Sequence, residues 1–597
     1  MKVNIIKTST VSSKMDEFVI ENEVLYECNL TGTVVVPENV TKIKATAFSN
    51  KTNIIKVVLP EGLKTIGTNT FIGCTSLEEV IIPESVEAIE DQAFFGCKKL
   101  KKVHLPKNLK RLCIKAFTDS GLESVDLPEH PDYVGSYVFA NSQLHQVTIP
   151  ANFPLTVAMF DECKHLETIT FEGTDIKVPG ICFKLCENLK NIDLRNIKTI
   201  GKGGFSGCKS LDFDVLPKDI RVNDSAFSGC GIKHITVENL NSIEGTEKVF
   251  SECHQLTEAV IEVRGANIPQ DVKEIPQALF SHCINLEKVL FTGMIGKITS
   301  IGFAAFEDTA LKKFTIPENI KKIDSMAFFK TEHLTEITLP EKLKTIGRQT
   351  FSESGLKSIT LPDSVEFTET KCFRDCYNLE EVTLPAKEFV VPDGMFMNCT
   401  VLKKVNNADK IVQLGKYAFY GANSLKQVNL SSAVNIGGSA FECSGLTSVK
   451  LSKCCTTLDM NAFYKCKNLK LADLSESSIE YFAPYIFYRC GGNKFMTEVI
   501  LPDKIWNVDE GAFVECYIKN LNIAAAAGKN VMISENAFIE SNIDVLTFAD
   551  NPDSHVYLNE SAFKNAFIGE LTIPDYLYDK YKNVWDNVRS AWDDANK

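Results

Sequence analysis

A phenylalanine returns at nearly constant spacing along almost the whole chain. The spacing is 21 to 26 residues, with one longer interval of 30 residues between Phe250 and Phe280. The mean, (563 − 48)/22, is about 23 residues. The series consists of Phe48, Phe71, Phe94, Phe117, Phe139, Phe160, Phe183, Phe205, Phe227, Phe250, Phe280, Phe306, Phe328, Phe351, Phe373, Phe396, Phe419, Phe441, Phe463, Phe487, Phe513, Phe538 and Phe563. Such a period predicts a stack of about 23 coils, and not the four or so globular domains that 597 residues suggest by length alone.

The rest of the repeat can be read from residues 77–100. Leu77, Val80 and Ile82 follow the spacing L-x-x-V-x-I, which predicts a short strand with Val80 and Ile82 buried. Pro83 ends this strand because it has no N–H to donate to a ladder.

The second half of the unit carries the phenylalanine. Val86 and Ile89 are expected to point inward again, and A-F-F-G-C predicts a single helical or 3₁₀ turn with Phe94 and Cys97 on one face. One unit cannot bury its own apolar side, so the strands of successive units should pair in parallel around a shared core. We expect an α/β solenoid whose parallel sheet is concave and whose short helical or 3₁₀ turns are convex.

The pattern L-x-x-V-x-I-P, then V-x-x-I, then A-F-x-x-C-x-x-L resembles the BspA-like, or Treponema-type, leucine-rich repeat family. The resemblance covers roughly residues 33–574 and departs from the commonest leucine-rich repeats, since the Asn column after the strand is missing. It implies a right-handed superhelix. It also implies a secreted or surface-associated protein of host-associated bacteria or parasitic protists, with a role in adhesion and protein binding.

Both ends of the chain differ from the repeat. Residues 1–36 are predicted to form an N-terminal cap, a hairpin or meander, ahead of about 23 repeats over residues 37–574. Residues 575–597 predict a C-terminal capping helix, with apolar residues at helical spacing from Leu577 to Trp592; a partner-binding helix is the alternative. The long intervals after Phe250 and Phe280 predict inserted loops.

Thirteen of the twenty cysteine residues occupy one position of the repeat, three residues after the phenylalanine. They are Cys74, Cys97, Cys163, Cys186, Cys208, Cys230, Cys253, Cys283, Cys376, Cys399, Cys466, Cys490 and Cys516. A single residue type in one repeat position indicates packing, with reduced thiols as small apolar groups; disulfides between coils are the alternative. The C-x-x-x-C pairs at Cys182 and Cys372 each lack a second local pair, so we expect no metal site.

The exposed positions of the predicted strands give the candidate binding face. This concave face is polar, mixed in charge and rich in Thr, and it almost lacks the Trp, Tyr and Arg residues that dominate protein interfaces. The candidate residues are Lys102, His104, Asp126, Gln146, Thr148, Thr170, Asp193, His234, Thr236, Lys313, Thr315, Glu336, Thr338, Glu381, Thr383 and Lys404.

Net charge and segment lengths restrict the partners. A net charge of −13 opposes binding to nucleic acid, and no stretch approaches the ~18 apolar residues of a membrane span. The N-terminal residues lack the apolar core of a secretory signal. The chain is therefore expected in the cytoplasm, or at the cell surface as a mature form, as the family resemblance implies.

No nucleophile, paired carboxylate or cofactor motif interrupts the repeat at catalytic spacing, so we expect neither an enzyme nor a cofactor. The favoured hypothesis is a monomeric recognition or adhesion protein that binds a protein partner, such as a host surface or matrix protein. The alternative is an intracellular scaffold or regulator built on the same repeat.

Overall fold

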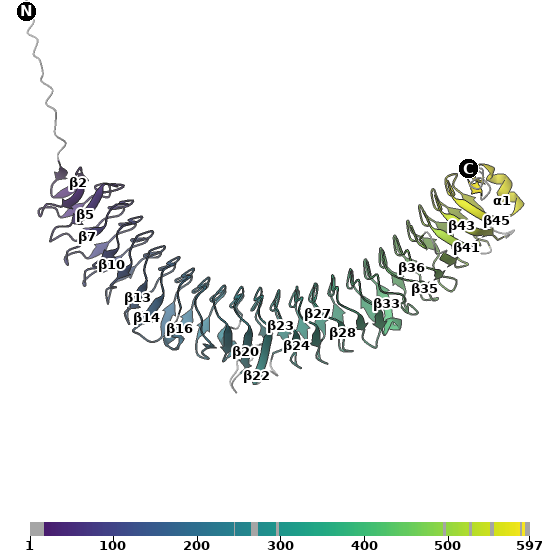
Figure 1. Cartoon of the computed structure of the whole chain (residues 1–597), viewed down its shortest axis with the longest axis horizontal. Helices are drawn as coiled ribbons and strands as arrows, with labels where there is room; N and C mark the ends of the chain where they lie inside the picture. Colours follow the sequence, from purple (N-terminus) through teal and green to yellow (C-terminus); the bar gives the residue numbers. More distant parts are fainter. Residues whose placement is uncertain are drawn as a thin grey trace, which may run out of the picture. The chain divides into compact units, whose positions relative to one another are not determined.

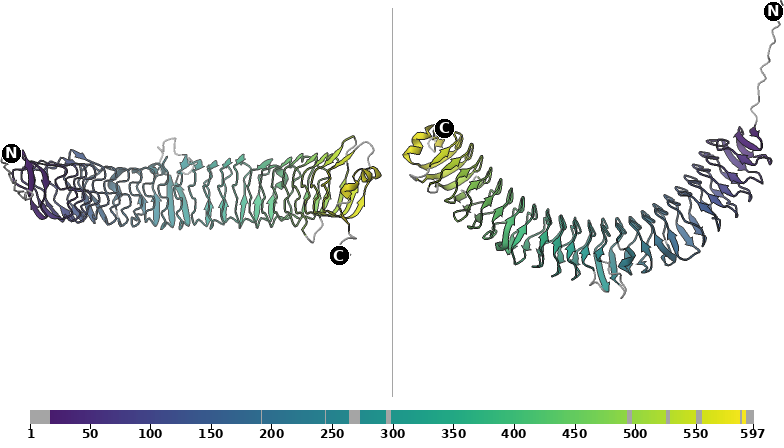
Figure 2. Two further views of the ribbon diagram at one scale, coloured as in Figure 1. Left: turned by 90° about the horizontal axis from the view of Figure 1, so that it is seen from above. Right: turned by 180° about the vertical axis from the view of Figure 1, so that it is seen from behind.

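The computed structural model describes residues 17–190, 192–243, 245–263, 273–293, 298–492, 497–524, 528–549, 555–585 and 588–590. The chain divides into two compact units, Met1–Ile268 and Pro269–Lys597. Each unit is a stack of coils with two short parallel strands per coil and few helices (Figures 1 and 2). The predicted parallel-strand solenoid is therefore confirmed.

The first strand of each coil is the predicted L-x-x-V-x-I segment. In the first unit these strands are β3 (Gly32–Val35), β5 (Ile54–Val58), β7 (Glu79–Ile81), β9 (Lys102–Val103), β11 (Ser124–Val125), β13 (Gln146–Ile149), β14 (Thr168–Phe171), β17 (Val215–Leu216), β19 (His234–Val237) and β20 (Glu258–Val263). In the second unit they are β22 (Lys288–Gly293), β24 (Lys313–Thr315), β26 (Glu336–Thr338), β28 (Ser358–Thr360), β30 (Glu381–Thr383), β32 (Lys404–Asn406), β35 (Ser448–Lys450), β37 (Leu471–Asp473), β39 (Thr497–Ile500), β41 (Tyr517–Ile523), β43 (Asn542–Phe548) and β45 (Phe567–Thr572).

A second strand precedes the phenylalanine in most coils. In the first unit these strands are β4 (Lys42–Ile43), β6 (Thr65–Ile66), β8 (Ala88–Ile89), β10 (Arg111–Leu112), β12 (Tyr133–Val134), β15 (Ile176–Val178), β16 (Ile197–Ile200) and β18 (Arg221–Val222). In the second unit they are β21 (Glu274–Ile275), β23 (Ser300–Ile301), β25 (Lys322–Ile323), β27 (Thr345–Ile346), β29 (Phe367–Thr368), β31 (Phe389–Val391), β33 (Ile411–Leu414), β34 (Asn435–Ile436), β36 (Thr457–Leu458), β38 (Tyr481–Phe482), β40 (Asn507–Val508), β42 (Val531–Ile533) and β44 (Val556–Leu558).

The repeat phenylalanine residues form one stack of rings in each unit. Neighbouring rings lie 4.8–5.9 Å apart in the first unit, as for Phe48 and Phe71 at 4.8 Å and Phe227 and Phe250 at 5.9 Å. The rings of the second unit follow the same geometry, from 6.0 Å between Phe280 and Phe306 down to 4.8 Å at its last pair. The rings are buried and nearly parallel, so they form the centre of each core.

The turn that carries each phenylalanine is not helical, which corrects the expected helical or 3₁₀ turn. In the coil of Phe94, the N–H groups of Gln92, Phe94 and Gly96 donate to carbonyls of the next coil over 2.8–2.9 Å. The alternate N–H groups, those of Ala93, Phe95 and Cys97, bond within the coil to the residue three positions earlier. A helix would keep every donor inside its own turn. Bonding between coils therefore replaces the helix.

The few 3₁₀ helices lie elsewhere. They are η1 (Leu194–Asn196), η2 (Leu240–Ile243) and η4 (Ala408–Lys410), and they follow the first-strand position in coils that lack the strand-ending proline.

The N-terminal end of the first unit begins with an antiparallel hairpin. Strand β1 (Phe18–Glu21) pairs with β2 (Val24–Cys28), and both turn residues, Asn22 and Glu23, have positive φ, as in the tight turns that join two strands. Strand β2 then pairs in parallel with β4, so the hairpin lies against the first coil. The rest of the expected cap, residues 1–16, lies outside the described residues.

At the C-terminal end, two short helices stand where one helix was expected. These are α1 (Asp575–Lys580) and α2 (Lys582–Trp585), and they are followed by strand β46 (Arg589–Ser590), which pairs with β45. The chain leaves the helical conformation at Tyr581, and Trp585 then packs 5.6 Å from Phe563, the last ring of the stack. Packing onto this ring overrides the uniform helical pattern. Trp592 lies outside the described residues, as do most of the inserted loops.

Candidate binding surfaces

With the exception of Asp193, the predicted binding residues lie on or next to the first strands, on their outward side, which we call the strand face. Thirteen of the sixteen predicted residues are exposed, and the other three, Thr236, Glu381 and Thr383, are half-buried. Several are direct neighbours across strands, as Thr148 is to Thr170 and Lys313 is to Glu336. Within each unit, residues of distant coils are not brought together.

The charged side chains of the strand face pair with one another. Lys313 Nζ lies 2.9 Å from Glu336, and Lys404 Nζ lies 2.8 Å from Glu381, whose pKa is lowered by this hydrogen bond. Exposed pairs of this kind contribute about 0–1 kcal/mol each. The charges therefore satisfy each other across neighbouring strands and do not by themselves indicate a partner.

Two grooves adjoin predicted residues. His104 and Asp126 line a groove of about 1000 Å³ in the first unit, where His104 Nε2 lies 2.8 Å from a Glu84 carboxylate oxygen. This hydrogen bond lowers the pKa of Glu84. In the second unit Lys313 and Thr315 line a smaller groove of about 510 Å³.

Asp193 is not on a strand, which corrects the prediction for this residue. It precedes η1, and its carboxylate accepts hydrogen bonds from the backbone N–H and the guanidinium of Arg195 at 2.8–3.0 Å. These bonds lower the pKa of Asp193. Its role is to cap the 3₁₀ helix.

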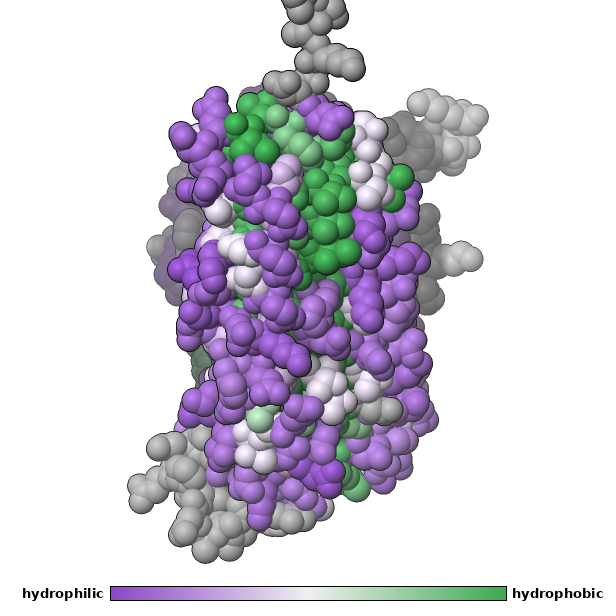
Figure 3. Space-filling view, turned by 90° about the vertical axis from the view of Figure 1, so that its left-hand side faces the viewer, coloured by the Kyte–Doolittle hydropathy of each residue, from purple (hydrophilic) through white to green (hydrophobic). Residues whose placement is uncertain are grey.

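The strand face is apolar in the first coils. Val35, Val58 and Ile81 are register neighbours on β3, β5 and β7, and Val35 and Ile81 are exposed. Figure 3, which looks onto this end, shows a band of hydrophobic side chains between hydrophilic borders. From Lys102 onward the same face is mostly polar, with Val215, Leu290 and Ile500 as exposed apolar residues.

A second outward row was missed by the sequence interpretation. In each second strand of the second unit one residue lies next to a buried residue and, except for the buried Asn507, is exposed or half-buried; we call this row the second-strand face. Its members are Glu274, Ser300, Lys322, Thr345, Phe367, Val390, Gln413, Asn435, Thr457, Tyr481, Asn507, Met532 and Tyr557. The detectable signal was an apolar or aromatic residue in a position that is polar in the neighbouring coils.

A mainly apolar groove of the second unit lies on this face. It has a volume of about 790 Å³ and is formed by the coils of β29, β31 and β33. Phe367 and Val390 line it, and 57% of the surface of Phe367 and 48% of that of Val390 are exposed to solvent. Carboxylates of Glu369, Glu388 and Asp393 also line it. The groove thus offers apolar side chains bordered mainly by carboxylates, with Lys387 as the one cationic side chain among its lining residues.

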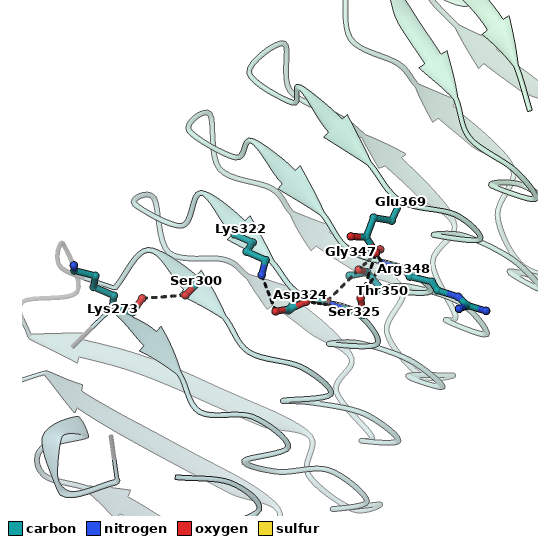
Figure 4. Close-up of polar contacts among 9 residues, drawn as sticks. All are labelled: Lys273, Ser300, Lys322, Asp324, Ser325, Gly347, Arg348, Thr350 and Glu369. Carbon is teal, nitrogen blue, oxygen red and sulfur yellow. Dashed lines mark hydrogen bonds and ion pairs between the residues drawn. The ribbon is translucent and has the colours of Figure 1, made fainter. Parts of the chain in front are cut away.

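Backbone and side-chain hydrogen bonds hold one of these carboxylates in place. Glu369 Oε2 accepts the Arg348 N–H at 2.9 Å and lies 3.5 Å from Ser325 Oγ, as Figure 4 shows. In the coil of Ser325, two coils before that of Glu369, Asp324 accepts from Lys322 Nζ at 2.8 Å. These contacts cross three coils and fix the border of the groove.

The thirteen cysteine residues that follow the repeat phenylalanine by three positions form the cysteine column. Their thiols form hydrogen bonds in addition to packing in the core. Cys97 Sγ donates to the carbonyl of Phe71 at 3.2 Å, and Cys208 Sγ to that of Phe183 at 3.2 Å. At least twelve of the thirteen column thiols make this contact with the phenylalanine of the preceding coil. All twenty cysteine residues are free thiols in this structure.

Burial makes the column thiols unreactive, and this can be measured. Burial raises the pKa of Cys74, Cys163 and Cys376 to about 11, so at pH 8 only about one thiol in a thousand is ionised, against about one in ten at pKa 9. We expect a maleimide at pH 8 to label the exposed Cys454 first and the column only after denaturation. Mass mapping gives the sites, and Cys454→Ser is the control. Rapid labelling of column members in the folded protein would contradict this prediction.

Metal binding and membrane insertion are two further classes of function to consider. Among the described residues, no group of three or more His, Cys, Asp or Glu side chains could hold a metal ion. None of the described helices is both long enough and apolar enough to cross a membrane.

Stacked coils with a short parallel strand, a buried aliphatic core and an outward strand face define a solenoid of the leucine-rich repeat class. The sequence matches the family described as BspA type leucine rich repeat region in overlapping segments that run from residue 18 to residue 590. The chain belongs to this family, as the repeat pattern predicted.

Solved structures with similar coils include bacterial leucine-rich repeat proteins. One from Bacteroides ovatus is 19% identical, with a TM-score of 0.23, and the match covers 83% of this chain and 94% of that one. A leucine rich cell surface protein from Faecalibacterium prausnitzii is 17% identical, with a TM-score of 0.27 and coverages of 82% and 96%. The T. pallidum leucine-rich repeat protein is 24% identical, with a TM-score of 0.23 and coverages of 36% and 77%. No curated protein matches the chain.

Proposed function

We propose that this chain is a nonenzymatic recognition or adhesion protein that binds another protein through its outward faces. The observation that carries the proposal is the groove at Phe367 and Val390, where apolar side chains stay exposed although the core beneath them is complete. Exposed apolar side chains in a groove are typical of protein-binding sites. The polar strand face, with the predicted residues other than Asp193, is proposed as a second and weaker contact surface.

Family membership supports the finer parts of the proposal. They are a right-handed winding of the coils, terminal caps at both ends, a monomeric state and a position at the cell surface, where the partner would be a host surface or matrix protein. Labelling of intact cells with a membrane-impermeant reagent tests the location. Recovery of the protein only from the cytosol would contradict it.

The free thiols favour one alternative, an intracellular scaffold or regulator. Twenty cysteine residues without a disulfide are typical of a reducing compartment. Ordered disulfides between coils in the protein isolated from its source would count against this alternative.

The recognition role can be tested with binders selected from a displayed protein library against the full chain. Their affinities are then measured for Phe367→Ala/Val390→Ala. We expect some of the selected binders to bind this double variant about 2 kcal/mol more weakly than the unaltered chain, which is roughly a thirty-fold rise in Kd. The reason is that these two residues are the exposed apolar contacts of the groove. Thr345→Ala/Asn435→Ala, on the same face, is the matched control. If no selected binder depends on Phe367 and Val390, the groove is not the recognition site.

A further inference from the structure

The C-terminal part of the second-strand face is aromatic. Strands β38, β40, β42 and β44 form one sheet, in which Tyr481, Asn507, Met532 and Tyr557 are successive register neighbours. The Trp506 ring lies 5.8 Å from the Tyr481 ring. Tyr481, Trp506, Met532 and Tyr557 are all exposed, and we call these four residues the aromatic platform.

The core does not require this platform. The inward residues of the same strands, Phe482, Val508, Ile533 and Leu558, are buried and complete the core. In the three preceding coils the outward position holds Gln413, Asn435 and Thr457. The repeat is therefore satisfied by polar residues at this position, and the aromatic ones need another explanation.

Carboxylates border the platform where its strands end. They belong to Asp459, which follows β36 of the preceding coil, and to Asp509, Glu510, Glu535 and Glu560, which follow β40, β42 and β44, and we call them the acidic rim. Glu510 accepts a hydrogen bond from the Tyr485 hydroxyl at 3.1 Å. Asp509 accepts a hydrogen bond from the Tyr481 hydroxyl, so the rim and the platform are in direct contact. Among the described residues, no Lys, Arg or His forms an ion pair with any of these five carboxylates. Where the strands begin, by contrast, Lys529 is paired with Glu480 at 3.7 Å.

One ring of the platform already receives a cation from the chain itself. Lys580 of α1 places its ammonium 4.6 Å from the centroid of the Tyr557 ring. In the described part of the chain no such cation lies over Tyr481 or Trp506. The Tyr481 and Trp506 rings, with Asp509 bonded to the Tyr481 hydroxyl, can receive a cation in the way that the Tyr557 ring receives Lys580.

We propose that the aromatic platform and its acidic rim bind a cationic, Arg- or Lys-rich peptide segment of a partner protein. Aromatic faces attract guanidinium and ammonium groups, and Arg in particular stacks on Trp and Tyr while it pairs with carboxylates. Carboxylates that form no ion pair within the described part of the chain add steering and selection by charge. The inference rests on the proposed recognition function but uses a site separate from the groove at Phe367.

The probe is a fluorescent ten-residue peptide of alternating Arg and Gly, and the comparison is the same peptide with Glu in place of Arg. Binding to the full chain is followed by anisotropy at low and high salt. We expect the Arg peptide to bind at least about ten-fold more tightly than the Glu peptide, with an affinity that falls as salt rises. Equal binding of the two peptides would overturn the proposal.

Variants distinguish binding at the platform from attraction by the overall negative charge of the chain. Tyr481→Ala/Trp506→Ala should weaken binding of the Arg peptide about ten-fold or more, and Tyr481→Phe/Trp506→Phe should retain most of it because the rings remain. Glu535→Gln/Glu560→Gln should weaken binding and reduce its salt dependence. The matched control, Glu332→Gln/Glu341→Gln, removes two exposed charges elsewhere in the second unit and should change little.

The outcomes distinguish this inference from the proposed function. If the Ala variant binds the Arg peptide like the unaltered chain, or the two Gln variants behave alike, the platform is not a cation site. A dimer of the full chain that Trp506→Ala abolishes would assign the platform to a second copy and overturn the cationic partner. Binders that depend on Phe367 would persist in each of these cases, and recognition would stand.

Discussion

Replacing Phe351 with alanine is expected to lower the local free energy of unfolding by about 3–5 kcal/mol. The Phe351 ring is fully buried and stacks between Phe328 and Phe373, at 5.4 Å from each. Its removal leaves a cavity between two rings whose positions are set by their own coils. Because a coil contacts only its neighbours, the loss should concentrate in the coils of these three residues.

Hydrogen exchange read by mass spectrometry is the appropriate measurement, since a long repeat array does not unfold as one two-state unit. Peptides that contain Phe328, Phe351 and Phe373 should exchange faster, while those near Phe513 should not. The control is Phe303→Ala in the same unit, where the ring is 42% exposed and the change should stay within about 0.5 kcal/mol. Equal effects at Phe351 and Phe303 would contradict the central role of the ring stack.

Replacing Gly355 with alanine should cost about 3 kcal/mol or more, the upper end of what overpacking costs. A Cβ on Gly355 would lie 2.0 Å from the Glu332 carbonyl oxygen, which is backbone of the preceding coil. The cause is a one-residue deletion: Leu356 follows Phe351 by five residues, whereas Leu334 follows Phe328 by six. The shorter path brings the two backbones together, and the Gly355 N–H bonds to the Thr331 carbonyl at 3.0 Å.

The matched control for this substitution is Gly438→Ala. A Cβ there would meet its nearest atom, the Met460 carbonyl oxygen, at an ordinary 3.4 Å. We expect the control to melt like the unaltered chain and Gly355→Ala to melt earlier and to give less soluble protein. A Gly355→Ala chain as stable as the control would show that the two coils can separate at little cost.

The sequence predicted the core because each core residue recurs about twenty times in the same position. The inward side chains Phe94, Val80 and Ile82 are all buried as expected. The non-helical turn could not be predicted, because A-F-F-G-C fits a helical turn locally. Its conformation depends on donors such as Gln92 N–H, which bond to the next coil.

The binding surfaces were harder to predict than the core. The strand face was found because first strands alternate over several residues, whereas Phe367–Thr368 is a strand of only two residues and shows no alternation. The sequence pattern therefore assigns Phe367 neither to the core nor to a binding surface. Its exposure, like that of Trp506, depends on packing that no single repeat contains.

The direction of the hydrogen bonds limits how such a chain can change length during evolution. At least twelve of the thirteen column thiols donate to the coil before them, and most of the repeat phenylalanine N–H groups donate to the coil after them. Copying or deleting one complete coil leaves every donor opposite an acceptor of the same kind, whereas a partial coil displaces a ring from its stack. Gene duplication and loss in steps of about 23 codons should therefore be tolerated, and two relatives can differ by several coils while each remaining interface is preserved.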